Sequence, residues 1–406
     1  MEGLRICVVG GSIAGCTAAI FAQRCGMQAA VFERSASALK ERGVALGVPT
    51  ATCIALRDQK IIGDDFPHVS IRSLSHASRS DSELPLGGCA GEVPTYLEAL
   101  RWGDLYNQLR SLVPDANYTA GLGVASVHDS GDFVDVTFDD GSDRRFDLVI
   151  FADGFGSQGR SLVSPDCEPR YQGYVIWRGI LPENELSDST PFEGKLQRVG
   201  FPNGHMFAYL LPGVGGQVQS GSRELNWGMF LPMAAGELDE FFLDRGGQQR
   251  GLSLPPGSMK EEQELRLKQR AAQLLPPFYA SVVNASRSTF AQAIMTALPT
   301  KYTKGRMCIV GDAGAVVQPF TTSGVFKGMR NAAELIRELN TSDEIYAGLD
   351  RWNQRQCHMG EGLARLGSLM EKRLIAETPD FSKMSQSSLS VWWGEIQQTL
   401  EQIMRP

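Results

Sequence analysis

The sequence lacks three things that would direct it to a special class of protein: paired cysteine motifs, long apolar runs and blocks of basic residues. Its eight cysteines form no C-x-x-C pair and no metal-ligand spacing, so we expect free thiols, a reducing cytoplasmic location and no metal site. No segment has the length of a membrane span, and we expect no signal peptide. A net charge of -7 argues against nucleic acids and anionic membranes as partners. With 406 residues, the chain is long enough for two domains.

The first thirty-four residues carry the most informative pattern. An apolar run at residues 6–9 ends at Gly10, small residues follow, and a second apolar stretch leads to Glu33. This order predicts the strand, tight turn, helix and strand that open a dinucleotide-binding domain. Gly10 permits the turn, Gly15 lets the helix pack closely on the strand, and Glu33 can accept hydrogen bonds from a ribose. Ser12 replaces the middle glycine of G-x-G-x-x-G; an ordinary βα turn is the alternative interpretation.

Two later apolar strands end in similar motifs. Residues 146–151 lead into Asp153 and Gly154, and residues 307–310 lead into Gly311-Asp312. A buried strand followed by an acidic residue and small residues is typical of a ligand-binding sheet edge. The sequence therefore predicts that three separated segments return to one nucleotide site.

The middle and the end of the chain have different patterns. Residues 174–230 are β-rich, and alternation on one strand places His205, Phe207 and Tyr209 on the same face. Leucines at helical spacing predict a helix over 96–112 that carries Arg101. Residues 350–404 are helical in pattern, and their apolar stripe predicts either core packing or a dimer contact.

The three motifs, in this order, resemble those of the class A (single-component) FAD-dependent aromatic hydroxylases, the p-hydroxybenzoate hydroxylase family. Each motif alone is weak evidence for this family, but the ordered set is strong evidence and spans about three quarters of the chain. Residues 10–13, 205–213 and 223–227 are similar to segments of the dihydroxypyridine hydroxylase-like branch.

This resemblance implies an α/β fold and a division into three regions. They are a Rossmann-like FAD-binding domain over 1–170 and 285–340, a β-sheet substrate domain over 171–284, and a helical C-terminal region over 341–406. Ala315 departs from a polar residue usual in the family, and Asn331 from an acidic one.

The resemblance also implies a cofactor and a reaction. NAD(P)H reduces FAD, O₂ forms a flavin C4a-hydroperoxide, and one oxygen atom passes to an aromatic or N-heteroaromatic small molecule. The residues assigned to the cofactor are Gly10, Ser12 and Gly15 for the pyrophosphate, Glu33 for the adenosine ribose with Arg34 beside it, Arg101 for the phosphates or the ribityl chain, Val124 for the adenine, Asp153 and Gly154 for both FAD and NAD(P)H, Asp312 for the ribityl chain, and Pro319 and Gly324 for the flavin ring.

Substrate contacts are less constrained by the sequence. Tyr209 could bond a ring hydroxyl and His205 could relay its proton, although a packed sheet tyrosine and a turn histidine are the alternatives. The further substrate candidates are Arg178, Arg223, Gln318 and Phe320.

Other functions remain open at this stage. One is a flavin monooxygenase of a larger natural product, acting by hydroxylation, epoxidation or Baeyer–Villiger insertion. Another is a flavin-binding protein without catalytic activity. The presence of all three cofactor motifs argues against this alternative. A flavin-dependent halogenase fits less well, because residues 177–182 match its W-x-W-x-I-P pattern only loosely.

Overall fold

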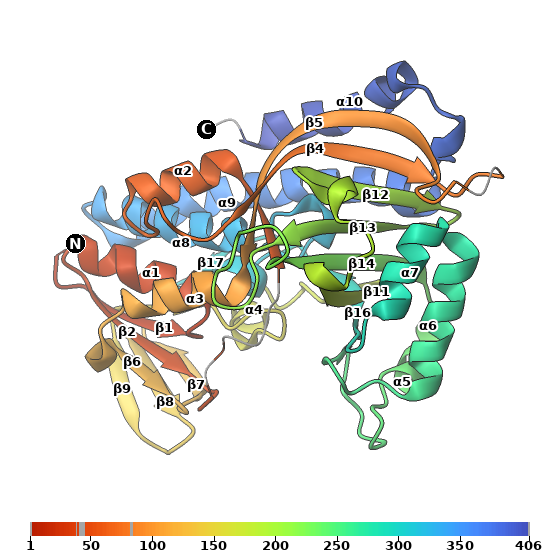
Figure 1. Ribbon diagram of the computed structural model, residues 1–406. Coiled ribbons are helices and arrows are strands. Elements are labelled where there is room, and N and C mark those ends of the chain that lie inside the picture. The colour runs from red at the N-terminus through yellow and green to blue at the C-terminus, as the bar shows by residue number, and fades with distance from the viewer. Residues whose placement is uncertain (1, 38, 40–44, 82–83, 405–406) are drawn as a thin grey trace.

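Two large sheets and one small sheet organise the computed structural model, which describes residues 2–37, 39, 45–81 and 84–404 (Figure 1). The helices of this described part are α1 (Ile13–Arg24), α2 (Thr50–Asp58), α3 (Trp102–Ser111), α4 (Gln158–Val163), α5 (Leu238–Phe241), α6 (Glu261–Leu274), α7 (Pro277–Ala285), α8 (Gly324–Asn340), α9 (Ile345–Glu371) and α10 (Gln386–Met404). The expected α/β fold, with a Rossmann-like part, a sheet-rich part and a helical C-terminal region, is confirmed.

The first sheet contains the three nucleotide motifs. Its described strands, in spatial order, are β17 (Thr303–Lys304), β18 (Met307–Ile309), β10 (Leu148–Phe151), β1 (Arg5–Val9), β2 (Gln28–Glu33) and β6 (Tyr118–Ala120). All neighbours pair in parallel except β17, which pairs antiparallel with β18. The carboxyl ends of the parallel strands therefore meet at one edge, and each motif follows one of these ends. The small sheet β7 (Val124–Asp129), β8 (Val134–Phe138) and β9 (Asp143–Phe146) lies beside it.

Small residues allow the helices to approach this edge. A Cβ added at Gly328 of α8 would lie 3.2 Å from the Cβ of Ala14 in α1 and 3.4 Å from the Cα of Gly311. Any larger residue at these positions would push the helices apart, because protein interiors leave no spare volume. The small-residue composition of α1 and α8 thus brings both helix N-termini against the strand ends.

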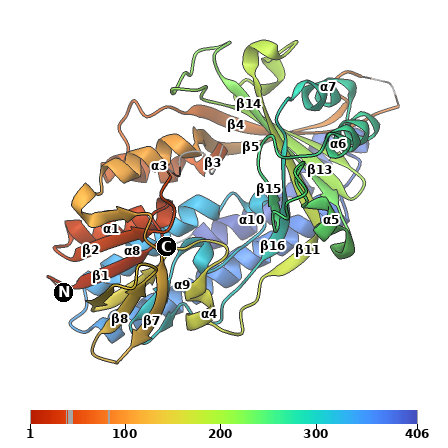
Figure 2. The same cartoon turned by 90° about the horizontal axis from the view of Figure 1, so that it is seen from below.

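The second sheet is larger and mainly antiparallel. Its described strands, in spatial order, are β15 (Ser253–Leu254), β16 (Phe290–Thr296), β11 (Arg170–Pro182), β14 (Glu224–Pro232), β13 (Gly204–Leu211), β12 (Lys195–Phe201), β4 (Val69–Ser78), β5 (Gly88–Arg101) and β3 (Ala45–Pro49). Three of them come from the first 101 residues, and β4 and β5 arch across the molecule to reach it (Figures 1 and 2). The predicted substrate region 171–284 therefore contains only some of the strands of this second sheet.

The predicted helix over 96–112 is wrong in its first part. Strand β5 continues to Arg101, pairing with β3, and α3 begins only at Trp102. The leucine spacing in this stretch fits a helix, but pairing with a strand 50 residues away overrides that local pattern. Arg101 therefore lies at a strand end instead of on a helix.

The two faces of the second sheet have different neighbours. Met206, Ala208 and Leu210 of β13 are buried in the core that includes residues of α6 and α7. The alternate residues His205, Phe207 and Tyr209 line a cavity, as the period of two predicts. The long helix α9 and the C-terminal α10 pack together, and α10 lies against β5. Trp393 and Ile396 of α10 are buried, so this part of the C-terminal stripe is core.

All eight cysteines are unpaired. In the described part of the chain, no helix has the length and apolar character needed to cross a membrane.

A buried ion pair at one end of the second sheet gives a prediction about stability. Arg223 Nε lies 2.9 Å from Glu183 Oε2, and its guanidinium also contacts Glu193. Arg223→Met should lower the free energy of unfolding by about 3–5 kcal/mol, because Glu183 would stay buried without a partner. The exposed pair of Arg145 and Asp135 is the control; Arg145→Met should cost less than about 1 kcal/mol in the same denaturant titration.

The same pair should respond to acid. Bonding to Arg223 lowers the pKa of Glu183 to about 2, below its ordinary value of 4.5. The stabilisation is therefore complete above about pH 4.5 and is lost as the pH falls toward 2. Wild-type stability should fall over this range more steeply than that of Arg223→Met. Equal pH slopes for the two proteins would contradict this assignment.

Candidate functional site

The turn after β1 is shaped for close backbone approach. Gly10 has φ +101°, and a Cβ there would lie 2.5 Å from the carbonyl oxygen of Ala152. A Cβ at Gly15 would lie 1.9 Å from the carbonyl oxygen of Gly10. Ser12 is the N-cap of α1, and its side chain makes no capping hydrogen bond. The first N–H groups of an α-helix have no acceptor within the helix, so those of α1 can donate to a bound pyrophosphate at this turn.

Glu33 is buried at the end of β2, where the sequence predicts a ribose contact. Its Oε2 accepts from the Gly11 N–H at 2.9 Å and its Oε1 from the Ser35 N–H at 2.9 Å. These two bonds fix the carboxylate at the edge of the sheet, while its remaining lone pairs can accept from ribose hydroxyls. Arg34 is exposed and Val124 is half-buried, and both lie outside the cavity described next.

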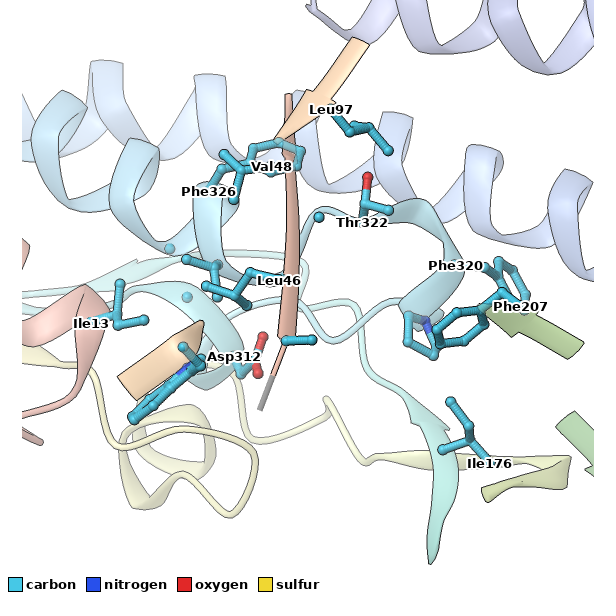
Figure 3. A pocket seen from close by; sticks show the side chains of 18 of the residues that line it. Ile13, Leu46, Val48, Leu97, Ile176, Phe207, Asp312, Phe320, Thr322 and Phe326 are labelled. Carbon is cyan, nitrogen blue, oxygen red and sulfur yellow. The ribbon is translucent and has the colours of Figure 1, made fainter. Parts of the chain in front are cut away.

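A cavity of about 390 Å³ runs from the β1 turn to the second sheet. The lining residues labelled in Figure 3 are Ile13, Leu46, Val48, Leu97, Ile176, Phe207, Asp312, Phe320, Thr322 and Phe326. Of the residues expected from the sequence, Ser12, Gly154, Arg178, His205, Tyr209, Asp312, Pro319, Phe320 and Gly324 also line it. The structure thus brings cofactor and substrate candidates from distant segments to one space.

Asp153 and Gly154 have different tasks. Asp153 Oδ1 accepts from Ser157 Oγ at 2.5 Å, and its Oδ2 accepts from the Gln158 N–H at 2.8 Å. The carboxylate therefore holds the first turn of α4, while Gly154 faces the cavity. Burial raises the pKa of Asp153, and the hydrogen bonds oppose that shift.

Asp312 follows β18 and lies near the N-terminus of α8. Its side chain is 49% exposed, and its Oδ1 accepts from Lys327 Nζ at 2.9 Å. Lys327 is almost fully buried and also donates to the carbonyl of Ala315. The Gly311 N–H donates to Asn331 Oδ1 at 3.0 Å. The two departures from the family pattern, Ala315 and Asn331, thus hold the loop that presents Asp312.

The start of α8 supplies further donors. A Cβ at Gly324 would meet nothing within 4 Å, so the helix N-terminus opens into the cavity. Thr322 just before it has a positive φ of 56°, which turns the chain into the helix. A helix N-terminus of this length favours partial negative charge nearby, which suits the pyrimidine edge of a reduced flavin.

The structure gives Arg101 different partners from those that the resemblance implies. Its guanidinium pairs with Glu224 and donates to the Pro212 carbonyl at 3.2 Å. It lies outside the cavity lining, so its charge is already neutralised within the second sheet. The contact to the FAD phosphates expected from the resemblance is not supported by this geometry.

His205 and Tyr209 project from β13 into the cavity. The Nδ1 of His205 lies 3.1 Å from the Leu374 carbonyl oxygen, so Nδ1–H donates and the buried Nε2 is left as an acceptor without a described partner. Burial and the charge of Arg198 lower the pKa of His205 well below its usual value, so a proton relay is disfavoured. His205 lies within a strand, so the turn histidine alternative is wrong. Burial raises the pKa of Tyr209 to about 12, which keeps its hydroxyl protonated as a donor.

The four remaining substrate candidates divide into two groups. Arg178 lines the cavity, and its Nε has no described partner. Phe320 lines it as well, with its ring centroid 5.6 Å from that of Phe230. Gln318 donates to Glu371 of α9 at 2.5 Å and faces a second cavity, of about 530 Å³, that shares Arg178 and Pro319 with the first. Arg223 is occupied by its two glutamates and faces neither cavity, so the structure contradicts its expected substrate role.

Sequence reasoning missed several residues of the site. Arg198 of β12 lines the cavity, as do Trp102 of α3 and the strand residues Leu46 and Val48 of β3. All residues of β12 from Leu196 to Phe201 are buried, so no alternation along this strand marks Arg198 in the sequence. The contributions of β3 and α3 depend on long-range pairing that no local pattern reveals.

Comparisons with known proteins agree with this arrangement. Residues 171–296 match the family model described as FAD binding domain-like. The 2,6-dihydroxypyridine 3-monooxygenase of Paenarthrobacter nicotinovorans is 28% identical over 373 residues, covering 91% of each chain. The 6-hydroxynicotinate 3-monooxygenase of Pseudomonas fluorescens is 24% identical and covers 82% of each chain.

Solved structures give the same result for the fold. The structure of 2,6-dihydroxypyridine-3-hydroxylase from Arthrobacter nicotinovorans has a TM-score of 0.84 at 26% identity, covering 95% of this chain and 97% of that one. A salicylate hydroxylase substrate complex has a TM-score of 0.73 at 17% identity, covering 100% of this chain and 99% of the other, and it shows the fold alone.

The turn after β1 gives a prediction about cofactor retention. Gly15→Ala places a methyl group against the Gly10 carbonyl, so the protein should lose bound FAD. Gly394→Ala in α10 is the matched control, because a Cβ there meets nothing within 4 Å. The ratio of flavin to protein absorbance after gel filtration measures the effect. A Gly15→Ala protein that retains FAD like Gly394→Ala would refute the assignment of this turn.

Proposed function

We propose that this chain is a class A FAD-dependent aromatic hydroxylase of the dihydroxypyridine hydroxylase-like branch. It is a FAD-dependent monooxygenase, and its substrate is a small aromatic or N-heteroaromatic ring. NAD(P)H is the reductant and O₂ the oxidant in this proposal. The supporting observation is the cavity of about 390 Å³ that joins the β1 turn and Asp312 to an aromatic face of the second sheet.

The residues present fit FAD. The glycine turn after β1 admits a pyrophosphate, Glu33 is fixed for a ribose, and Asp312 and the α8 N-terminus face the space expected for the ribityl chain and ring. Bound FAD would supply the redox chemistry, taking electrons from the reductant and activating O₂. We assign Gly10, Ser12, Gly15, Glu33, Arg34, Val124, Gly154, Asp312, Pro319 and Gly324 to its binding.

The cavity lining favours a planar ring as the substrate. The cavity of about 390 Å³ shares Arg178, Asp312 and Pro319 with the second one of about 530 Å³, and part of this joint space would hold the cofactor. The remaining space is bounded by Phe207, Phe230 and Phe320, whose rings can pack against a planar substrate.

The protein's own groups have limited but defined tasks. Tyr209 donates its hydroxyl hydrogen to a ring oxygen and thereby orients the ring. Burial and the charge of Arg198 lower the pKa of His205 and keep its ring neutral. Its Nδ1–H donates to the Leu374 carbonyl, which leaves Nε2 as an acceptor. The surrounding apolar residues would exclude water from the space between the bound ring and the cofactor.

Location and assembly belong to the same proposal. The free cysteines suit a reducing cytoplasm; burial raises the pKa of Cys7 and Cys308, so these thiols are unreactive. We also infer a homodimer, and gel filtration would measure its size.

The first experiment measures turnover. FAD-loaded protein is mixed with NADH or NADPH in air and with hydroxylated pyridines or phenols. A ring substrate should accelerate the oxidation of the reduced nicotinamide and yield an oxygenated ring. Flavin that is reduced equally fast with and without every ring compound would contradict the small-ring proposal.

Tyr209 gives a sharper test. Tyr209→Phe should lower kcat/KM roughly 10- to 100-fold, the effect of one lost hydrogen bond to a charged or polarised oxygen. FAD binding should be unchanged. Because the pKa of Tyr209 is raised to about 12, the wild-type kcat/KM profile should show no inflection from this group between roughly pH 6 and 9.

Tyr279→Phe is the control for that substitution. Tyr279 is also buried but lies on α7, where its hydroxyl donates to Gln197 Oε1 at 3.1 Å. Its kcat/KM should match the wild type. Equal losses for the two variants would mean that Tyr209 acts through stability alone.

A further inference from the structure

Asn226 of β14 lies on the cavity face of the second sheet, directly beside Tyr209. It is paired with Tyr209 on one side and with Ile180 of β11 on the other. Directly paired residues share a face of the sheet, and Tyr209 lines the cavity. The next residue, Trp227, points to the opposite face, where its Nε1 donates to Ser286 Oγ at 2.8 Å. The strand therefore holds the Asn226 side chain against the tyrosine.

The amide of Asn226 is buried without hydrogen-bond partners. The residue is 0% exposed, and in the described part of the chain neither Oδ1 nor Nδ2 completes a hydrogen bond. An unpaired buried polar group destabilises a fold, so each such group calls for an explanation, and a task in catalysis is one.

A second buried amide of the same sheet shows the contrast. Gln197 of β12 is paired with Ala208, which belongs to the core on the other face. Its Oε1 accepts from Tyr279 Oη at 3.1 Å, and its Nε2 donates to the Pro191 carbonyl. Gln197 is thus an amide bonded to a tyrosine for structural reasons, whereas Asn226 has both amide groups available on the cavity side.

The ring of Tyr209 is held in place, but its hydroxyl hydrogen is free to choose a direction. Phe207 stacks on the ring, with the centroids 6.0 Å apart and the planes at 20°. A tyrosine hydroxyl can still rotate, and its oxygen can both donate and accept. A group that donates to this oxygen therefore directs the hydroxyl hydrogen to another side.

Asn226 supplies such a donor. Burial raises the pKa of Tyr209, and the charge of Arg178 and the amide of Asn226 both oppose that shift. A hydrogen-bond donor favours the ionised phenol, so the Nδ2–H end of the amide is the end that acts on the tyrosine. The bond is not closed in this structure. Catalytic hydrogen bonds are often long or poorly aligned until the substrate is bound.

The ends of both strands are fixed close to this pair. Arg101 donates to the carbonyl of Pro212, just after β13, at 3.2 Å and pairs with Glu224 at the start of β14. Glu224 lies two residues before Asn226, and Pro212 three residues after Tyr209. The ion pair therefore keeps the two strands in register where the amide and the phenol meet.

We propose that Asn226 is a positioning residue, whose Nδ2–H donates to Tyr209 Oη and so directs the tyrosine's hydroxyl hydrogen into the cavity. Tyr209 then favours rings that carry an acceptor oxygen, such as a pyridone. This inference rests on the proposed hydroxylase function and deepens it.

A double-mutant cycle on ligand binding tests the proposal. FAD-loaded wild type, Asn226→Leu, Tyr209→Phe and the double variant are titrated calorimetrically with 2-pyridone and with toluene, a ring of similar size without an oxygen. Asn226→Leu and Tyr209→Phe should each lower the ratio of pyridone affinity to toluene affinity roughly 3- to 10-fold. The double variant should lower it no further than Tyr209→Phe alone, because Asn226 acts through the tyrosine.

Two further variants separate positioning from packing. Asn226→Gln keeps an amide donor on a longer side chain and should retain part of the affinity ratio. Gln197→Met removes the bonded amide on the other face, so it should lower the melting temperature and leave the ratio unchanged. Asn226→Leu should melt at or above the wild-type temperature, because it removes an unpaired buried group.

Four results would overturn the proposal. They are wild-type protein that does not bind 2-pyridone, an unchanged ratio in Asn226→Leu, a double variant whose loss is the product of the two single losses, and an unfolded Asn226→Leu beside a folded Asn226→Gln that has lost the ratio.

The proposed function fails separately. Binding that follows the predicted cycle, with no oxygenated product from any ring, would leave Asn226 as a positioning residue and remove hydroxylation. Hydroxylation with equal kcat/KM in wild type and Asn226→Leu would retain the function and remove the task of Asn226.

Discussion

The whole arrangement depends on how closely the backbone after β1 approaches the start of α1. A methyl group at Gly15 would overlap the Gly10 carbonyl, and Gly10 itself is in a conformation that other residues rarely adopt. This contact fixes the α1 N-terminus at the edge of the parallel sheet. Because β1, β2, β10 and β18 end at the same edge, residues from four distant segments meet there. The cavity begins at that edge.

The second sheet closes the cavity from the opposite side, and its face was only partly predictable. The alternation of β13 correctly placed His205, Phe207 and Tyr209 together, because a period of two needs no knowledge of the rest of the fold. Arg198 lines the same cavity and was missed, because β12 is buried without alternation and no local pattern marks the residue. Arg101 and Arg223 were given ligand roles, yet each is neutralised by glutamates that no sequence spacing reveals.

The cofactor edge was easier to predict than the substrate face for a physical reason. A strand followed by a glycine turn or an aspartate is a local pattern, and parallel strands bring such patterns to one edge automatically. The substrate face instead combines β3, β4 and β5, which end by Arg101, with strands that begin only at Arg170. The helix predicted over 96–112 failed at the same place, because pairing of β5 with β3 outweighs the helical spacing of its leucines.

Isotope labelling tests the central claim, that one cavity unites flavin and ring for oxygen transfer, most directly. The FAD-loaded protein would turn over a ring substrate under ¹⁸O₂ in ordinary water, and mass spectrometry would follow the product. The account predicts one ¹⁸O atom on the ring of each product molecule, because the new oxygen comes from O₂. A product whose new oxygen comes from water, or consumption of O₂ that forms only hydrogen peroxide with every ring compound, would contradict it.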